Sequence, residues 1–401
     1  MSNKIQVLKG FRDFLPVEAR KRQWLRAQMI KVFEKWGYEP LETPTLEPYD
    51  LFKGEVGEDE KLFYKFKDLG DREVMLRYDQ TVPTCRVIGQ YANEIKFPFR
   101  RYQIQSNFRA EKPQAGRFRE FVQADIDIFG IASPLADAEA IAVSLDLYRS
   151  LGFKKAVAVI NSRDLMKGVP YEAIVAIDKL KKIGVDGIIA DMVAKGIDKD
   201  QAQKYFDYVK NIQPDETIKT IFEYLKSYGF DDDWYSFEPT LARSFSYSQG
   251  PIWEMVIPEY PSGSVGGGER YDGMMKRITG KDIPATGIAF GFDRTLEAIE
   301  VCGLLPKLNI STQVLVTVFS PELRDKAIEL STRLRRAGVG VELYPDDRTK
   351  LEKQLKYANA KSIPFVTILG PEEIRNKTVK LKNMDTGEQK CLPDTALISI
   401  F

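Results

Sequence analysis

The 401-residue sequence contains no histidine. This absence excludes histidine nucleophile relays, histidine general bases and histidine-ligated zinc from any chemistry that the chain performs. A reaction would have to depend on arginine, lysine, carboxylates, hydroxyls, amides and a hard cation such as Mg²⁺. Compositional drift is the simplest explanation of the missing residue type.

The chain is also poor in cysteine and in long apolar runs. Cys85, Cys302 and Cys391 are too few and too scattered for a disulfide framework or a cysteine-ligated metal, which fits a reducing cytoplasm. We expect no membrane span, because no run of about 18 apolar residues exists, and no signal peptide opens the chain. The net charge of +1 does not exclude a nucleic-acid partner, because acids elsewhere can balance a basic surface.

Residues 101–130 show the most regular pattern in the chain. Side chains of unlike character alternate in both halves of this stretch, which predicts two strands with different faces. One face carries Gln103, Gln105, Asn107, Arg109, Phe121, Gln123, Asp125 and Asp127. Arginines bracket the charged loop between the strands, and their guanidinium forks suit the oxygens of a polyphosphate. An edge hairpin with ordinary surface charges is the alternative.

The residues of this stretch resemble a known motif. Arg109, Glu111, the charged loop and the returning Arg-Phe-Arg of 117–119 are similar to motif 2 of class II aminoacyl-tRNA synthetases. The longer string FRAEKPQAGRFREFVQADIDIFG resembles the histidyl-tRNA synthetase family. The resemblance implies activation of L-histidine with ATP and Mg²⁺, followed by transfer to tRNA(His), in a cytoplasmic homodimer.

Further segments carry the same resemblance. Residues 74–82 resemble the LRxDxT segment of the family, although Asp79 or Thr81 could equally cap a helix. Residues 263–273, with three successive glycines followed by Glu-Arg-Tyr-Asp-Gly, are similar to the second family-specific motif. Residues 287–296 resemble motif 3, whose arginine contacts the outer phosphates of ATP.

The resemblance also implies site residues. The implied catalytic residues are Arg109, Arg243 and Arg294. The implied ATP site consists of Arg109, Glu111, Arg117, Arg119, Phe121 and Arg294. The implied histidine site consists of Asp79, Thr81, Gln123, Asp127, Arg243, Tyr247 and Tyr271. Asp127 and Tyr271 would face the imidazole, because a buried acid opposite a ring N–H discriminates against substrates without that donor. No metal ligands are assigned.

The expected fold class is α+β, with a class II synthetase catalytic domain built on an antiparallel sheet flanked by helices. This domain is expected at 1–163 and again at 236–306. A helix and a proline-rich strand at 17–48 resemble motif 1, which forms the dimer interface in class II enzymes. The charged residues at 54–72 predict a loop or lid.

Two further parts complete the expected organisation. Short helices with breaks at Gly184 and Gly196, among others, predict a helical insertion at 164–235, for which a charged spacer is the alternative. After a linker at 307–312, alternating strands and helices at 313–401 predict a small α/β domain. It resembles the anticodon-binding domain of class II synthetases; by its pattern alone it is a soluble α/β module.

Several positions depart from the family pattern, Ser248 and Asp293 among them, and keep alternatives open. Ser248 stands where a second tyrosine normally lines the amino-acid pocket, and Asp293 replaces the commoner glutamate of motif 3. One alternative is a histidine-sensing paralogue, such as the regulatory subunit of ATP phosphoribosyltransferase, which typically lacks the C-terminal domain. Another is an RNA-binding module with an inactive synthetase fold, which would bind tRNA in a salt-dependent manner without turning over ATP.

Overall fold

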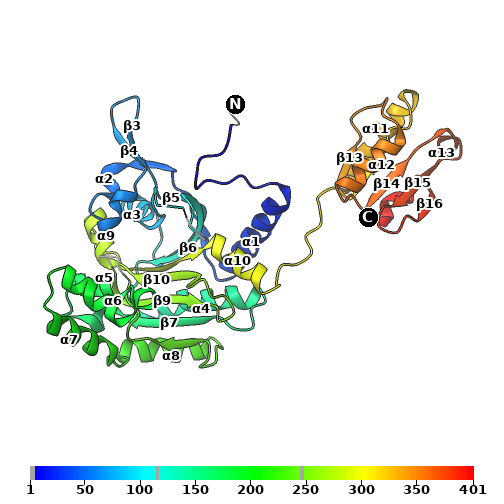
Figure 1. Ribbon diagram of the computed structural model, residues 1–401. Helices are drawn as coiled ribbons and strands as arrows, with labels where there is room; N and C mark the ends of the chain where they lie inside the picture. Colours follow the sequence, from blue (N-terminus) through cyan, green and yellow to red (C-terminus); the bar gives the residue numbers. More distant parts are fainter. Residues whose placement is uncertain (1–4, 114–116, 244–247) are drawn as a thin grey trace. The chain divides into compact units, whose positions relative to one another are not determined.

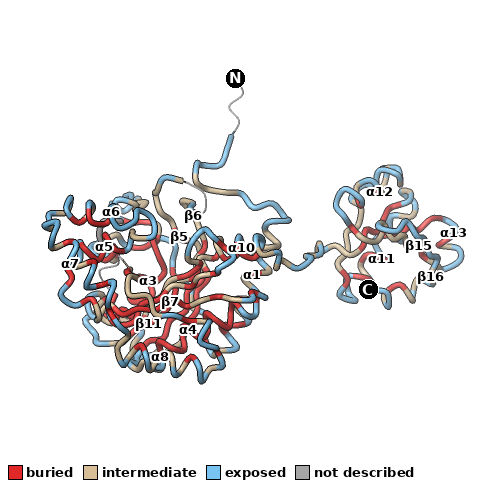
Figure 2. Tube along the Cα trace, turned by 60° about the horizontal axis from the view of Figure 1, so that its bottom comes forward, coloured by how far each residue is buried: buried red, intermediate tan, exposed pale blue. Residues whose placement is uncertain are grey.

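The chain folds into two compact units, residues 1–306 and residues 307–401. The residues that the computed structural model describes are 5–113, 117–243 and 248–401, without the side chains of 57–59. Each unit has buried cores of its own, seen as red segments enclosed by exposed ones in Figure 2.

The first unit is built on a mainly antiparallel sheet (Figure 1). Its strands lie in the order β1-β5-β6-β11-β10-β9-β7-β8, and the pairs β1–β5 and β7–β8 at its two edges are parallel. The strands are β1 (Glu39–Pro40), β5 (Phe99–Phe108), β6 (Glu120–Phe129), β7 (Val157–Ser162), β8 (Tyr235–Phe237), β9 (Gln249–Val256), β10 (Gly266–Arg270) and β11 (Ala285–Gly291). The predicted α+β fold with an antiparallel sheet is confirmed.

Helices pack against this sheet and extend it. The helices of the first unit are α1 (Pro16–Lys35), α2 (Tyr49–Phe52), α3 (Thr81–Gln90), α4 (Pro134–Ser150), α5 (Tyr171–Ile177), α6 (Leu180–Ala194), α7 (Lys199–Lys210), α8 (Glu216–Ser227), α9 (Asp272–Thr279) and α10 (Phe292–Val301). Short 3₁₀ turns add η1 (Gly57–Leu62) and η2 (Arg163–Met166). Local signals mark several helix ends: Gly37, with φ of +79°, follows α1, and the Ser133 hydroxyl accepts a hydrogen bond from the Leu135 amide at the start of α4.

Strands β5 and β6 form the hairpin predicted for residues 101–130. Their register places Arg101 opposite Asp127, so both side chains lie on the same face of the sheet. Ile126, between them in the alternation, joins the hydrophobic core on the other face. The alternative of an edge hairpin is wrong, because β6 also pairs with β11 and is therefore an interior strand.

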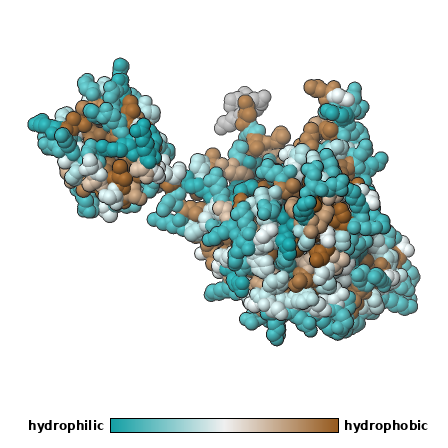
Figure 3. Space-filling model, turned by 180° about the vertical axis from the view of Figure 1, so that it is seen from behind, coloured by the Kyte–Doolittle hydropathy of each residue, from teal (hydrophilic) through white to brown (hydrophobic). Residues whose placement is uncertain are grey.

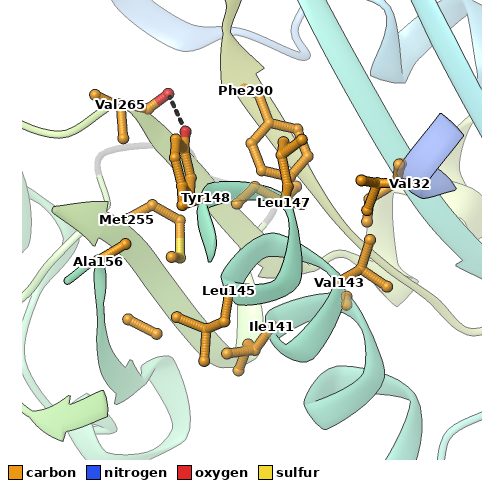
Figure 4. Packing of buried hydrophobic residues seen from close by; sticks show 14 of the residues in the cluster. Val32, Ile141, Val143, Leu145, Leu147, Tyr148, Ala156, Met255, Val265 and Phe290 are labelled. Atoms are coloured by element: carbon orange, nitrogen blue, oxygen red, sulfur yellow. Dashed lines mark hydrogen bonds between the residues drawn. The ribbon is translucent and has the colours of Figure 1, made fainter. Parts of the chain in front are cut away.

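Helix α4 lies at the centre of the main core. Every side chain from Ala136 to Tyr148 is buried, because α4 packs against the sheet, α1 and α8 at once. Figure 4 shows α4 beside Met255 and Phe290 of the sheet, where the Tyr148 hydroxyl donates a 3.4 Å hydrogen bond to the Val265 carbonyl. Full burial of a side chain the size of Phe290 contributes about 1.5–3 kcal/mol to the free energy of unfolding, so this core anchors the sheet that carries the polar face.

The loop expected at 54–72 is wrong in part. β3 (Lys65–Lys67) pairs with β4 (Glu73–Leu76), which also pairs with β2 (Leu46–Pro48), to form a smaller sheet in the order β2-β4-β3. The β3–β4 hairpin projects from the body of the first unit (Figure 1). β3 has only three residues, Lys-Phe-Lys, which is too short for a periodic signal, and its pairing with β4 decides its conformation.

Helices α5 to α7 form a separately packed group at one end of the sheet (Figure 1), with a core of their own that includes Phe206. α8 differs, because Ile221 and its neighbours join the main core beside α4. The break predicted at Gly184 is confirmed: this residue has non-helical backbone angles, with φ of +70°, and divides α6 into two helical stretches at a kink. The break at Gly196 is also confirmed. The outer boundaries of the helical insertion stay a prediction.

The second unit is the small α/β domain that alternating strands and helices predict. Its sheet has the order β13-β12-β14-β15-β16, with β12 parallel to both of its neighbours. The elements are β12 (Val314–Val316), η3 (Pro321–Leu323), α11 (Arg324–Arg336), β13 (Val341–Leu343), α12 (Leu351–Ala360), β14 (Phe365–Ile368), α13 (Pro371–Arg375), β15 (Thr378–Asn383), β16 (Gln389–Pro393) and η4 (Leu397–Ile400). The sequence did not predict α13, which is little more than one turn long.

Hydrophilic side chains cover most of the surface shown in Figure 3, with smaller apolar groups between them. Exposed large apolar residues include Ile5, Leu8 and Leu15 before or at the start of α1, and Leu69 between β3 and β4. Within the described ranges, no helix combines the length and the hydrophobicity that crossing a membrane requires.

Candidate active site

A pocket of about 200 Å³, here named the inner cavity, opens on the polar face of the sheet. Strands β6, β10 and β11 form its floor. Its lining residues are Asp79, Thr81, Arg109, Gln123, Asp125, Asp127, Arg243, Gly267, Glu269, Tyr271, Gly287, Ile288 and Ala289. The residues predicted for the histidine site are all among them except Tyr247, which lies outside the described residues.

Asp79 lies at the start of α3 with its carboxylate in the inner cavity. Its Oδ1 accepts a 3.1 Å hydrogen bond from the Val82 amide, so it caps the helix as well as lining the cavity. Burial raises the pKa of Asp79 to about 6, although the amides of Val82 and Thr81 and the charge of Arg109 lower it. The capping and binding interpretations are compatible, because the second carboxylate oxygen remains for a ligand.

We expect an Asp79→Asn variant to show a different pH dependence of stability. Between pH 4 and pH 6 the folded protein holds the Asp79 proton more firmly than the unfolded chain does, so wild-type stability falls as the pH rises through this window. The variant lacks this loss, so its free energy of unfolding relative to wild type should rise by about 2 kcal/mol between pH 4 and pH 7. Urea unfolding followed by tryptophan fluorescence measures this, because all four tryptophans lie in the first unit. Parallel stability curves for the two proteins would contradict the assignment.

Asp127 lines the inner cavity and also belongs to a buried ion-pair network. Its Oδ1 accepts a 2.5 Å hydrogen bond from the Tyr271 hydroxyl, and its Oδ2 forms an ion pair with Arg101, which is fully buried. Burial raises the pKa of Asp127, whereas Arg101 and Tyr271 lower it. A Cβ at Gly287 would lie 2.0 Å from Asp127 Oδ1, so this glycine makes room for the carboxylate. Both carboxylate oxygens are therefore already engaged.

Arg243 crosses the floor of the inner cavity above β10. Its Nη2 lies 3.3 Å from Glu269 Oε1, and the other oxygen of Glu269 accepts a hydrogen bond from Ser248. A Cβ at Gly267 would lie 1.8 Å from Arg243 Nη1, and a Cβ at Gly268 would meet the Trp253 indole on the opposite face. The successive glycines thus let β10 lie between a guanidinium and an indole, which explains the glycine run in the sequence.

A second pocket of about 380 Å³, here named the outer cavity, adjoins the inner one. The two share Arg109, Gln123, Gly267 and Ala289. The outer cavity also contains the predicted ATP-site residues Glu111, Arg117, Phe121 and Arg294. The Arg109 guanidinium lies over the rings of Tyr78, at 4.1 Å, and Phe121, at 5.0 Å, which hold it at the junction of the cavities.

Asp293, the departure from motif 3, organises one side of the outer cavity. Its Oδ1 accepts hydrogen bonds from Arg12 at 2.9 Å and Arg22 at 2.5 Å, and its Oδ2 accepts one from the Val122 amide at 3.2 Å. The Arg12 guanidinium also lies 3.3 Å from the Phe118 ring centroid. The Asp293 carboxylate therefore links the N-terminal segment, β6 and α10 beside the arginines that are predicted to bind phosphate.

Arg119 is the predicted ATP-site residue that does not line the outer cavity. Its guanidinium donates instead to the carbonyl oxygens of Glu111, at 3.1 Å, and Lys9, at 3.2 Å. These contacts favour a role in holding the loop after β5 and the N-terminal segment. Its assignment to ATP stays a prediction.

Sequence reasoning missed three side chains of the inner cavity as site residues. Asp125 was placed on the correct face by the alternation of β6, but no role was derived for it. Glu269 stands within the family-like glycine motif, and Ala289 within the motif 3 segment. The period of the strand was the signal that could have assigned Asp125.

The charges of the two cavities differ. Asp79, Asp125, Asp127 and Glu269 make the inner cavity rich in acids, whereas Arg109, Arg117 and Arg294 make the outer cavity basic. An acidic pocket suits a ligand with an ammonium group, and clustered guanidinium forks suit phosphates. Among the described residues, no cluster of histidine, cysteine or carboxylate side chains could hold a metal ion by itself. The arrangement can therefore bring an amino acid against a polyphosphate.

Comparisons with known proteins agree with this geometry. The family model described as histidyl-tRNA synthetase matches residues 10–183, and the one described as anticodon binding domain matches residues 313–401. The chain is 34% identical to a protein named histidine–tRNA ligase from Christiangramia forsetii, with 98% of each chain covered. The chain belongs to the histidyl-tRNA synthetase family. It is also 33% identical to a histidine–tRNA ligase from Helicobacter pylori, with 96% of each chain covered.

Solved structures of this family share the fold. A histidyl-tRNA synthetase from Nostoc sp. superimposes with a TM-score of 0.81 at 26% identity, covering 98% of each chain. A Bacillus halodurans structure titled as an ATP phosphoribosyltransferase regulatory subunit or histidyl-tRNA synthetase has a TM-score of 0.71 at 22% identity, which shows the fold alone. The regulatory paralogue is less supported, because the chain matches histidine–tRNA ligases over its full length and includes the C-terminal domain.

Proposed function

We propose that this chain activates L-histidine with ATP to histidyl-adenylate and transfers the histidyl group to the 3′ end of tRNA(His). The observation that carries the proposal is the junction of an acid-rich and an arginine-rich cavity at Arg109, with Arg243 over the shared Gly267, in a chain of the histidyl-tRNA synthetase family. The acid-rich cavity suits the ammonium group of an amino acid, and the basic cavity suits the triphosphate.

The first step requires two anions to approach each other. An oxygen of the histidine carboxylate attacks the α-phosphorus of ATP, and pyrophosphate leaves, so no protein nucleophile or base is needed. Arg109 and Arg243 would stabilise the charge on the α-phosphate from the two sides of the junction. This chemistry is compatible with a chain that has no histidine.

The remaining assignments follow the two cavities. Arg294, whose Nη1 donates a 2.8 Å hydrogen bond to the Ser264 carbonyl, would contact the γ-phosphate, and Glu111 and Phe121 would contact the adenine. Asp79, Thr81 and Gln123 would hold the ammonium group. Tyr247, which the family pattern also assigns to the histidine site, carries no structural argument because it lies outside the described residues.

The Mg²⁺ requirement belongs to the same proposal. Asp293, a carboxylate of the outer cavity, is engaged by Arg12 and Arg22, and no group of metal-ligating side chains gathers within the described part of the chain. We therefore propose that Mg²⁺ enters as the ATP complex and is held mainly by phosphate oxygens and water, as is usual for this ion.

The proposal extends to the partners and the setting of the enzyme. The second unit would bind the anticodon of tRNA(His), which its match to the anticodon-binding family supports. A homodimer is proposed through the motif 1 segment, where β1 is an edge strand and Leu15, Val17 and Leu46 are exposed. A reducing cytoplasm is proposed because Cys85, Cys302 and Cys391 are free thiols.

Amino-acid-dependent ATP–pyrophosphate exchange tests the proposed function directly. We expect exchange with histidine and with none of the other standard amino acids, followed by histidine transfer to tRNA(His) when the tRNA is added. Exchange with a different amino acid would show that Ser248 and its neighbours define another specificity. Histidine binding without exchange would favour the regulatory paralogue.

A further inference from the structure

Asp125 is a buried acid whose partner is missing from the described part of the chain. Its side chain lines the inner cavity, and the residue is 2% exposed. Neither Oδ1 nor Oδ2 has a hydrogen-bond partner among the described residues. A buried carboxylate in this state is costly, because it has lost its water without gaining donors in return. The position of this unpaired carboxylate on the cavity wall therefore points to a donor supplied by a ligand.

The neighbouring acids of the inner cavity are in a different state. Asp79 accepts the Val82 amide, Glu269 is paired with Arg243 and Ser248, and Asp127 is engaged by Tyr271 and Arg101. Each of these carboxylates already has at least one oxygen engaged by a structural partner. Asp125 can offer both of its carboxylate oxygens to a ligand.

The register of the sheet places only small residues beside Asp125 on β11 and β10. On β11 its partner is Ala289, and the next residue in the same row, on β10, is Gly267. Neither residue carries a side-chain donor for the carboxylate, and the Arg243 guanidinium lies over Gly267. Along β6, Asp125 stands between Gln123 and Asp127, and each step of two residues is about 6.6 Å. It therefore lies deeper than Gln123, on the side away from the adenine-binding Phe121.

The electrostatic setting agrees with a donor as the missing partner. Burial raises the pKa of Asp125 well above its ordinary value, and the nearby acids Asp127 and Asp79 raise it further. Arg101 and Arg109 lower it, but neither guanidinium forms a hydrogen bond with this carboxylate. A ligand N–H aimed at Asp125 would favour the charged form.

We propose that Asp125 accepts the ring N–H of the bound amino acid and is the residue that selects histidine. The inference rests on the proposed function and changes one assignment within it, because sequence resemblance gives this role to Asp127. In this arrangement Asp127 is a positioning residue, which fixes the Tyr271 hydroxyl and neutralises Arg101. Discrimination follows because a substrate without a ring donor leaves the Asp125 carboxylate unpaired in a buried site.

The test compares two amino acids on the wild-type protein and on Asp125→Ala. The second amino acid is β-(2-thiazolyl)alanine, which has the same α-amino and carboxyl groups and a ring of similar size without an N–H. We expect kcat/KM for histidine in ATP–pyrophosphate exchange to fall by about 10²–10³-fold in the variant, while kcat/KM for the thiazole stays constant or rises. The preference of the enzyme for histidine should therefore collapse.

A matched variant, Asp127→Asn, separates selection from positioning. It keeps an oxygen for Tyr271 but removes the charge opposite Arg101, so it should lower kcat/KM for the two amino acids by similar factors. Equal losses for both amino acids in Asp125→Ala would overturn the inference, as would no loss for either. Asp125→Asn, with an unchanged KM for ATP, controls for misfolding. A wild-type protein without histidine-dependent exchange would instead overturn the proposed function.

Discussion

Replacing Arg243 by alanine should reduce the rate of histidine-dependent ATP–pyrophosphate exchange by about 10²–10³-fold. The guanidinium lies over Gly267, which lines both cavities, and is held by Glu269, so it is preorganised for the role that we propose at the α-phosphate. Arg243→Lys should recover part of the activity, because it restores the charge but not the planar fork. Steady-state exchange kinetics, with separate KM values for ATP and histidine, measure the effect.

Gly267→Ala offers a control that leaves Arg243 in the chain. Its Cβ would displace the guanidinium, so the expected loss is of the same order as for Arg243→Ala. If both changes act through the same group, the double variant should be no slower than Arg243→Ala alone. Additive losses would show that Gly267 serves another purpose, and full activity of Arg243→Ala would remove it from the mechanism.

Asp127→Ala should destabilise the first unit by about 3–5 kcal/mol. The change leaves the Arg101 guanidinium fully buried without its carboxylate, and arginine cannot become neutral by losing a proton. The Tyr271 hydroxyl loses its acceptor at the same time. Urea unfolding followed by tryptophan fluorescence measures the loss.

Asp125→Ala is the matched control for this prediction. Asp125 lies two residues away on the same face of β6 and is buried to a similar extent, but its carboxylate has no hydrogen-bond partner within the described residues. Its removal should cost less than about 1 kcal/mol or should increase stability, although we expect it to abolish the preference for histidine. Equal destabilisation by the two variants would mean that Asp125 has a structural partner.

Sequence patterns predicted the parts of the fold that have strong local signals. The period of residues 101–130 gave the β5–β6 hairpin and its two faces, and alternating elements gave the second unit. Sequence patterns did not predict elements that are short or that depend on contacts between distant residues. β3 is held by pairing with β4, and α13 is a single short helix. Gly184, in contrast, is a strong local signal, and it interrupts α6 where the sequence predicted a break.

The candidate site likewise has a part that sequence patterns predicted and a part that they could not predict. The alternation of β6 placed Gln123, Asp125 and Asp127 together, but it could not show which acid is already occupied. That distinction depends on Arg101, which the strand register brings opposite Asp127, and on Tyr271, which lies 144 residues further along the chain. Contacts made across such a separation leave no periodic signal in the sequence.

The order of the strands along the chain also determines how early during synthesis the candidate site can form. β6 ends at Phe129, but its partner β11 begins only at Ala285, after the helices α5 to α8 have been made. At a rate of about 5–20 residues per second on the ribosome, roughly 8–30 s pass between the synthesis of β6 and that of β11. During that interval the nascent chain presents an open strand with its acids unpaired by Tyr271. Newly made protein therefore depends on β5 and α4 to keep β6 from pairing with other chains.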